Sequence, residues 1–342
     1  MWQAEVRVDL DAIRANVARL RSGTSADLMA VVKGDGYGHG MIPAARAALD
    51  AGASWLGVCT LDEALTLRRA GITAPVLAWL LTPGLPLHEG VAADVDLSAA
   101  SIDQVGEMST AAQQAGRTAR VHLKIDTGLS RGGATVADWP ALLDAAAQAE
   151  ADGTIDVVGV WSHFVYADAP GHPTIDRQLA AFHDGLAMAE KAGLRPRLRH
   201  LANSAATLTR PDTHFDLVRP GIALYGLSPI AGETFGLRPA MTARARVTLT
   251  KRVAAGSGVS YGHTYVTDRE TTLAVVPLGY ADGVPRHASS RGPVQLGGRV
   301  RTIAGRVCMD QIVLDCGDDS VAAGDVATLF GNGDRGEPTA DD

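Results

Sequence analysis

The sequence contains little cysteine, and the few cysteines present do not match two common uses of this residue. Cys59, Cys308 and Cys316 are the only cysteines among 342 residues, and none stands in a C-x-x-C pair. An odd number with this spacing fits neither a disulfide framework nor a zinc site, and it is typical of a reducing compartment. We therefore expect three small, buried hydrophobic side chains and no bound metal.

Long hydrophobic runs and basic runs are also missing. No apolar stretch reaches the roughly 18 residues of a membrane span. The N-terminal MWQAEVRVDL has no basic segment followed by an apolar core, unlike a secretory signal. Lys and Arg number 31 against 38 Asp and Glu, a net charge of −7, which argues against a nucleic-acid partner. These absences predict a cytoplasmic protein that acts on a small molecule and binds neither membrane nor nucleic acid.

The larger part of the sequence repeats a strand–helix pattern. Between about Leu28 and Gly226, eight apolar runs alternate with longer amphipathic stretches, several of which end in glycine as helices often do. The runs are LMAVVKG, WLGVCT, APVLAWL, VDLSAA, ARVHLKID, DVVGVWSHF, RLRHLAN and FDLVRPGIALYG. Short runs without clean alternation favour parallel strands covered on both faces. Eight such units predict an α/β fold, a TIM (β/α)8 barrel; an open doubly wound sheet is disfavoured because no G-x-G-x-x-G turn follows the first run.

The pattern of strand and helix signals changes after Leu227. A Pro/Gly-rich connector, SPIAGETFGLRPA, leads into the β-rich runs MTARARVTLTKRV, TTLAVVPLGY, GPVQLGGRVRTIAGRV and QIVLDC, with no helical pattern between them. These β-rich runs predict a separate, mainly antiparallel β domain. We expect the barrel over residues 1–227, with residues 1–8 as candidates to join the β domain, and the linker and β domain over residues 228–342.

Lysine 33 closes the first predicted strand. Because catalytic groups of a TIM barrel lie at the carboxyl ends of its strands, this position points to function. The segment AVVKGDGYGHG has glycines at 34, 36, 38 and 40, which let the backbone approach a ligand closely. A lone lysine is usually a surface cation, but at the end of a buried strand it can be desolvated enough to form a Schiff base.

The other strand ends also carry polar side chains. These are Lys124, Asp126 and Arg131 after the fifth strand, His163 after the sixth, Asn203 and Ser204 after the seventh, and Arg219, Gly221 and Ile222 after the eighth. Asn203 and Ser204 resemble the N-cap of a short helix. Phosphate sites of these barrels use the loops after strands seven and eight, where free N–H groups stabilise a dianion. A lysine at strand one and a phosphate site at strands seven and eight together predict pyridoxal phosphate.

Eight segments extend this interpretation to a family. They are AVVKGDGYGHG, KIDTGLSRGG, WSHF, LANSAAT, LVRPGIALYG, VSYGHTY, LGYADG and GRVCMDQ, and they run in order from the first strand to about Gln311. The ordered set resembles the alanine racemase family, which interconverts L- and D-alanine and supplies D-alanine for peptidoglycan. Any one segment is a weak signal, whereas the ordered set is specific. The resemblance implies a pyridoxal-phosphate enzyme that forms a homodimer with shared active sites.

The resemblance implies two catalytic bases. Lys33 would hold the cofactor and serve one face of the substrate, and Tyr261, supplied by the partner protomer, would serve the other. A phenol has an ordinary pKa of about 10, so Tyr261 needs nearby positive charge to act near neutral pH. Arg131 and a hydrogen-bonded His163–Arg219 pair are the implied sources. Arg219 would also face the pyridine nitrogen and leave it unprotonated, which shortens the life of the carbanion and suppresses transamination.

The resemblance gives further residues supporting roles. It assigns Tyr37, Asn203, Ser204, Gly221 and Ile222 to cofactor binding, Arg131 and Met309 to the substrate, Lys124, Asp310 and Tyr280 to support of the site, and Asp168, Arg286 and Arg306 to its entrance. For Lys124 two interpretations stay open. The lysine is either carbamylated, creating an anion that orients Arg131, or it is an ordinary lysine paired with Asp126 or a bound anion.

The sequence departs from the family pattern in two places. Gly34 and Gly36 stand where the family usually has alanines, which predicts a looser loop. The sequence ends at GNGDRGEPTADD, whereas the family continues with a helical stretch and a strand whose tyrosine binds the phosphate. We expect either a truncated C-terminus or a further tail that carries this tyrosine, and the sequence leaves both open.

Three other functions compete with a racemase specific for alanine. Decarboxylases of the same two-domain fold usually place a carboxylate at the pyridine nitrogen, and Arg219 argues against them. A non-catalytic pyridoxal-phosphate carrier needs only a barrel, and the β domain with Tyr261 and Met309 argues against it. A racemase of broader specificity, acting on serine, lysine or other amino acids, remains open.

Overall fold

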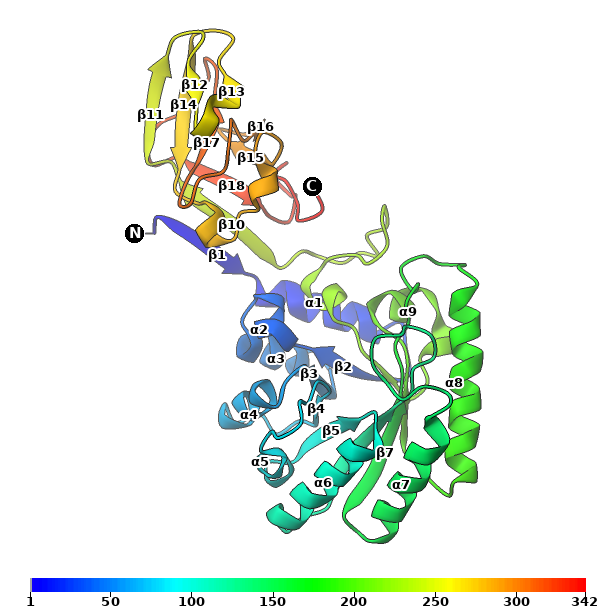
Figure 1. The fold of residues 1–342 in the computed structure, drawn as a ribbon. Coiled ribbons are helices and arrows are strands. Elements are labelled where there is room, and N and C mark those ends of the chain that lie inside the picture. The colour runs from blue at the N-terminus through cyan, green and yellow to red at the C-terminus, as the bar shows by residue number, and fades with distance from the viewer. Residues whose placement is uncertain (1) are drawn as a thin grey trace. The chain divides into compact units, whose positions relative to one another are not determined.

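The computed structural model describes residues 2–342 and divides them into two compact units (Figure 1). One unit is Leu10–Arg238, and the other combines the residues up to Asp9 with Pro239–Asp342. The connector over residues 228–240 contains neither helix nor strand. Most of it belongs to the first unit, where the buried Asn16 side chain binds both the N–H and the C=O of Arg238, at 2.8 and 2.9 Å.

Eight parallel strands form the centre of the larger unit. They are β2 (Asp27–Val31), β3 (Trp55–Val58), β4 (Val76–Ala78), β5 (Val95–Ala99), β6 (Ala119–Lys124), β7 (Ile155–Trp161), β8 (Leu198–His200) and β9 (Leu217–Val218). The sheet order is β8-β7-β6-β5-β4-β3-β2-β9. Backbone hydrogen bonds from Asp216 to Arg199, 3.1 Å, and from Arg219 to Ala202, 2.9 Å, link the two ends of this order. The predicted TIM barrel is confirmed, because eight parallel strands, each overlapping one of the eight apolar runs, form this order and its two ends are linked.

Helices follow the strands around the outside of this unit (Figure 1). They are α1 (Leu10–Arg21), α2 (Lys33–Tyr37), α3 (Met41–Asp50), α4 (Leu61–Arg69), α5 (Leu87–Ala92), α6 (Ile102–Ala115), α7 (Trp139–Ala151), α8 (Thr174–Lys191) and α9 (Ser204–Thr209), with the 3-10 turns η1 (Pro211–Thr213) and η2 (Ile222–Tyr225). Local capping sets several ends. Thr60 and Glu63 form a capping box at α4, and left-handed Gly116 ends α6.

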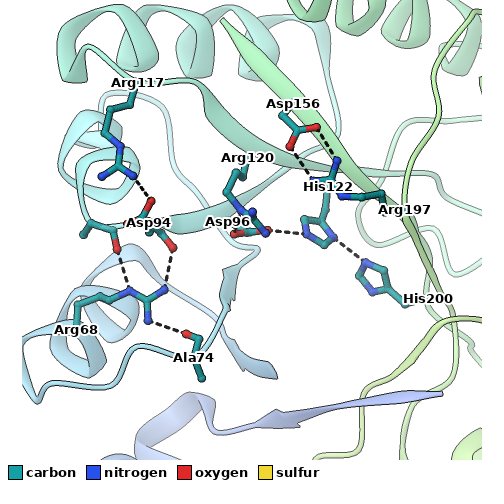
Figure 2. Close-up of polar contacts among 11 residues, drawn as sticks. Arg68, Ala74, Asp94, Asp96, Arg117, Arg120, His122, Asp156, Arg197 and His200 are labelled. Carbon is teal, nitrogen blue, oxygen red and sulfur yellow. Dashed lines mark hydrogen bonds and ion pairs between the residues drawn. The ribbon is translucent and has the colours of Figure 1, made fainter. Parts of the chain in front are cut away.

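The barrel contains an apolar cluster, and an arginine of an outer helix supports the entry to two of its strands. Met29, Trp55, Leu77, Val158 and Leu217 form one buried apolar cluster. At the amino-terminal ends of the strands, Arg68 of α4 donates to the carbonyls of Ile72, Ala74, Ala93 and Asp94 at 2.7–2.9 Å. Figure 2 shows Arg68 with two of these residues, Ala74 and Asp94. These bonds tie α4 to the segments that enter β4 and β5, so this arginine is structural.

The smaller unit is built from antiparallel strands. A five-stranded sheet has the order β1-β10-β18-β15-β16, a three-stranded sheet the order β11-β14-β17, and β12 pairs with β13. The strands are β1 (Ala4–Val8), β10 (Met241–Arg246), β11 (Leu249–Val253), β12 (Gly258–Val259), β13 (Tyr265–Val266), β14 (Thr271–Val276), β15 (Pro293–Leu296), β16 (Arg299–Thr302), β17 (Ile312–Asp315) and β18 (Val326–Phe330), and the 3-10 turns are η3 (Tyr261–His263), η4 (Tyr280–Asp282) and η5 (Arg286–Ala288). This confirms the predicted antiparallel β domain, with β1 from the start of the chain paired to β10.

Two further properties concern the whole described chain. Within residues 2–342, no helix is both long enough and apolar enough to cross a bilayer. Over the same residues, no group of three or more His, Cys, Asp or Glu side chains is arranged to hold a metal ion.

Candidate active site

The carboxyl ends of the barrel strands surround a cavity of about 680 Å³. It brings together the predicted barrel residues Lys33, Tyr37, Lys124, Arg131, His163, Asp168, Asn203, Ser204, Arg219, Gly221 and Ile222. The cavity wall also includes Trp79 and Trp161, which the sequence analysis did not single out. Both tryptophans lie at strand ends, where an aromatic residue is hard to distinguish from ordinary core. Among the described lining residues, Asp168 is the only acid beside two lysines and two arginines, so the cavity favours anions.

Lysine 33 is held by a turn of unusual handedness. It follows Val32 directly, and the next four residues, 34–37, all have φ between 52° and 63°. Hydrogen bonds close this left-handed turn, from Gly36 N to Val32 O at 2.8 Å and from Gly38 N to Gly34 O at 3.0 Å. The Glu63 carboxylate also accepts from Gly34 N at 2.6 Å. Hydrogen bonds therefore close the loop for which the sequence predicted looseness, and glycine is the residue with least strain at this φ.

Arginine 219 is a buried cation without an acidic partner. Its Nη2 donates to the carbonyl of Ser162 at 2.7 Å and lies 3.3 Å from His163 Nδ1, while Nη1 lies 3.3 Å from His200 Nδ1. The guanidinium also packs over Trp161, 4.9 Å from the ring centroid. Within residues 2–342 no carboxylate forms an ion pair with it. Burial lowers the pKa of Arg219 to about 9, so the group is still charged at neutral pH.

The two histidines beside Arg219 are neutral acceptors. Burial, followed by the charges of Arg219 and Arg131, lowers the pKa of His163 to about 3. Burial and Arg219 also lower the pKa of His200 well below its ordinary value. A neutral imidazole has one unprotonated nitrogen, so each ring can accept an N–H of Arg219. His200 is a functional neighbour that the sequence analysis missed.

Lysine 124 faces the same cavity without a carboxylate partner among the described residues. Its Nζ lies 4.3 Å from the centroid of the Trp161 ring. Burial, with repulsion from Arg219 and Arg131, lowers the pKa of Lys124 to about 8. The proposed partner Asp126 uses Oδ1 to accept the backbone N–H groups of residues 128–130 at 2.8–3.2 Å. The pairing of Lys124 with Asp126 is therefore not present.

Side-chain hydroxyl groups contact the backbone of the segments that follow β8 and β9. Asn203 caps α9 through a bond from Ala206 N to Oδ1 at 3.1 Å, as its N-cap position predicted. Ser204 Oγ accepts from Gly221 N at 2.8 Å. A Cβ at Gly221 would overlap the hydroxyl of Tyr37, so the close approach of these two residues requires glycine. Burial raises the pKa of Tyr37, which keeps its hydroxyl protonated as a donor.

The remaining predicted residues belong to the β unit and do not line this cavity. Tyr261 and Met309 are 69% and 58% exposed. Tyr261 follows Ser260, whose φ is +61° and whose hydroxyl donates to Arg306 O at 2.7 Å. Tyr280 N donates to Cys308 O at 3.0 Å, and Ala281 N donates to Met309 O at 2.8 Å. Hydrogen bonds therefore connect the loop that carries Met309 to the loops that carry Tyr261 and Tyr280. Further residues lie on the same unit: Arg286 and Arg306 line a separate cavity of about 550 Å³, and exposed Asp310 binds the Gln311 side chain.

Comparisons with known proteins cover nearly the whole chain. The family described as "Alanine racemase, N-terminal domain" matches residues 8–229, and "Alanine racemase, C-terminal domain" matches residues 240–342. The chain belongs to the alanine racemase family. The alanine racemase of Salinispora arenicola is 80% identical over 100% of this chain and 92% of the relative. That of Frankia casuarinae is 63% identical over 98% of this chain and 88% of the relative.

Solved structures of the family share the fold. The alanine racemase from D-cycloserine-producing Streptomyces lavendulae has a TM-score of 0.98 and 56% identity, covering 99% of this chain and 90% of that chain. The alanine racemase of Bacillus anthracis with bound L-Ala-P has a TM-score of 0.90 and 36% identity, covering 99% and 89%. These likenesses confirm the resemblance drawn from the ordered segments. They make the chain an enzyme of the isomerase class.

The left-handed turn at Lys33 leads to a stability prediction. Gly34→Ala should lower the free energy of unfolding by about 1 kcal/mol, because an L side chain is strained at φ +61°. Gly106 is the matched control, since it is exposed inside α6 with open space around it. Gly106→Ala should raise stability by about 0.5–1 kcal/mol. Urea unfolding midpoints measure both, and a stabilising Gly34→Ala would contradict the left-handed turn.

Proposed function

We propose that the chain interconverts L- and D-alanine with pyridoxal phosphate bound in the barrel cavity. The observation that carries the proposal is the cavity itself, which combines the Lys33 amine, the unpaired cation of Arg219 and the Ser204–Gly221–Tyr37 group of hydroxyl and backbone contacts. Relatives up to 80% identical are named alanine racemase, and one neighbour in the family has L-Ala-P bound.

The residues of the cavity fit the chemistry of this cofactor. Its phosphate is a dianion, and the cavity is lined by four cationic side chains and a single acid. The Tyr37 hydroxyl and the backbone of Gly221 and Ile222 would hold the phosphate, with Ser204 and Asn203 positioning that segment. Lys33 would form the covalent link to the cofactor aldehyde. Arg219 would face the ring nitrogen, where a donor that keeps its proton leaves this nitrogen unprotonated.

When bound, pyridoxal phosphate makes the α-proton of an amino acid acidic by delocalising the electron pair left behind. Residues of the chain itself transfer the protons and orient the substrate. Lys33 Nζ accepts or returns the proton on one face of the substrate, and Tyr261 Oη does so on the other. Arg131 and the backbone of Met309 orient the substrate carboxylate. Lys124, Asp310 and Tyr280 support these groups, and Asp168, Arg286 and Arg306 line the entrance.

Arg219 also separates this proposal from a decarboxylase. Such an enzyme gains from a carboxylate at the ring nitrogen, which stabilises the protonated ring and so strengthens it as an electron sink. The guanidinium here contacts carbonyls and neutral imidazoles, with no acid beside it in the described chain. A racemase needs only a short-lived carbanion that soon regains a proton, and a charged arginine at the ring nitrogen favours this short lifetime.

We further propose a homodimer in which each site takes Lys33 from one protomer and Tyr261 from the other. Tyr261 and Met309 are large apolar side chains that are mostly exposed, which is the state expected of residues that a partner covers.

This activity implies a cytoplasmic enzyme that supplies D-alanine for peptidoglycan. Broader specificity, for serine or other amino acids, is the second candidate.

The racemase proposal predicts both activity and a covalent link. Purified protein loaded with pyridoxal phosphate should interconvert D- and L-alanine faster than serine or lysine, and its gene should rescue growth of bacteria that require D-alanine. Borohydride reduction should attach the cofactor to Lys33, because only a Schiff base is reduced to a stable bond. Chiral chromatography and peptide mass spectrometry measure these results.

The control for this experiment uses the other lysines. The sequence has four, of which Lys191 and Lys251 are exposed outside the cavity. Lys33→Ala should abolish the attachment, whereas Lys191→Ala should leave it unchanged. An attachment that persists in Lys33→Ala, or equal rates for all amino acids, would contradict the assignment.

The shared site predicts rescue between two inactive variants. Lys33→Ala and Tyr261→Phe homodimers should each be nearly inactive. When equal amounts are unfolded and refolded together, about half of the dimers are mixed and roughly a quarter of all sites are intact under two-fold symmetry. Activity should therefore recover to about a quarter of wild type. Activity no higher than the parents, with mixed dimers verified by mass, would show that each chain builds its own site.

Carbamylation of Lys124 is the third prediction of this proposal. Carbon dioxide adds only to a neutral amine, and a pKa of about 8 leaves part of Lys124 neutral near pH 7. Protein in ¹³C-bicarbonate should show a carbamate NMR signal that disappears in Lys124→Ala and remains in Lys191→Ala. The signal should be lost as the pH falls well below 8, because protonation removes the nucleophile. A spectrum without the signal near pH 8 would leave Lys124 an ordinary cation.

A further inference from the structure

A line of buried polar side chains crosses the barrel interior and ends at Arg219. It starts at Asp96 in β5, continues through His122 in β6, and reaches His200 at the end of β8 (Figure 2). These three side chains are at most 1% exposed, and Arg219 is 4% exposed. The line runs from the amino-terminal half of the barrel to its carboxyl ends, where the cavity lies.

Each neighbouring pair in this line is within hydrogen-bond distance. Asp96 Oδ2 lies 3.1 Å from His122 Nε2, and His122 Nδ1 lies 2.9 Å from His200 Nε2. His200 Nδ1 lies 3.3 Å from Arg219 Nη1. At the far end, Arg120 binds both oxygens of Asp96, at 2.8 and 3.1 Å, an ion pair that fixes the orientation of that carboxylate.

The two ends of the line determine where the protons are. A guanidinium can only donate, so His200 Nδ1 accepts from Arg219 and the His200 proton is on Nε2. That proton is donated to His122 Nδ1, so the His122 proton is on Nε2. An ionised carboxylate can only accept, and Asp96 accepts the His122 proton. All four groups are therefore satisfied by one arrangement of protons only.

We propose that Asp96 and His122 are positioning residues that hold His200 in its Nε2–H tautomer and thereby orient the Arg219 guanidinium toward the cofactor ring. The proposal rests on the proposed function for the identity of the group that Arg219 faces. With His122 removed, His200 is free to carry its proton on Nδ1. That N–H would oppose an N–H of Arg219, and the guanidinium would lose an acceptor.

The energetic cost of the line supports a role beyond filling space. Burying charged and polar groups is costly, and apolar side chains of similar volume often serve stability equally well or better. The same interior uses Met29, Leu77 and Leu217 in this way. Aromatic contacts add to the rigidity, since Trp161 stacks on His200 at an interplanar angle of 3° and also lies under Arg219.

The test reads the tautomers directly. In protein labelled with ¹⁵N-histidine and loaded with pyridoxal phosphate, NMR should show His200 and His122 protonated on Nε2 and unprotonated on Nδ1. In His122→Phe and in Asp96→Leu, the His200 signals should shift toward a mixture of tautomers. The ¹⁵N signal of labelled cofactor ring nitrogen should move with them, because it reports the hydrogen bond from Arg219.

Kinetics and controls separate positioning from simple loss of structure. Both variants should lower kcat about tenfold, the size found for outer contacts that orient metal-binding histidines, with a smaller change in KM. His122→Gln keeps a donor and an acceptor and should restore part of the signal and of kcat. His183→Phe, at an exposed histidine of α8, should change neither.

Two results would overturn the proposal. One is a wild-type His200 protonated on Nδ1. The other is a set of folded variants whose His200 and ring-nitrogen signals equal those of wild type, even if their melting temperatures fall; Asp96→Leu keeps this test available if His122→Phe does not fold. Failure of the proposed function appears separately, as absence of alanine racemisation in wild type while the histidine tautomers are still as expected.

Discussion

The unpaired charge of Arg219 is the constraint on which the barrel site depends. A guanidinium buried to this degree needs acceptors on all sides, and here carbonyls, two neutral imidazoles and the face of Trp161 provide them. Burial, reinforced by this charge, lowers the pKa values of His163, His200 and Lys124. Burial and this one cation together keep the two imidazoles neutral, and the unpaired cation favours an electron-rich ligand in the cavity.

Rigidity around this charge comes from two different parts of the barrel. Beneath it, the hydrogen-bonded line from Asp96 permits a single arrangement of protons. Across the cavity, the left-handed turn after Lys33 is held by backbone bonds and by the Glu63 carboxylate. Groups that bind or react must keep their geometry without reorganising, and packed strands supply that better than free loops.

Much of the fold and of the site could be predicted from the sequence. The eight barrel strands were visible because short apolar runs alternate with amphipathic stretches, and their carboxyl ends carried Lys33, Lys124, His163 and Arg219 to one cavity. Short β18, by contrast, was missed because its five residues are only partly buried and lack a distinct pattern. The handedness at Gly34 was also missed, since composition shows that glycine is present but not which φ it adopts.

The sequence by itself determined which chemical groups stand at the strand ends, because strand periodicity and parallel order place those ends on one face. Only the tertiary structure decided which of these groups touch. The sequence made Asp126 a plausible partner for Lys124, but in the structure its carboxylate accepts hydrogen bonds from neighbouring backbone N–H groups. Asp96, His122 and His200 lie on three different strands, and their contact depends on register and on the curvature of the barrel. Such long-range geometry is set by the packing of the whole sheet, which no local pattern of residues encodes.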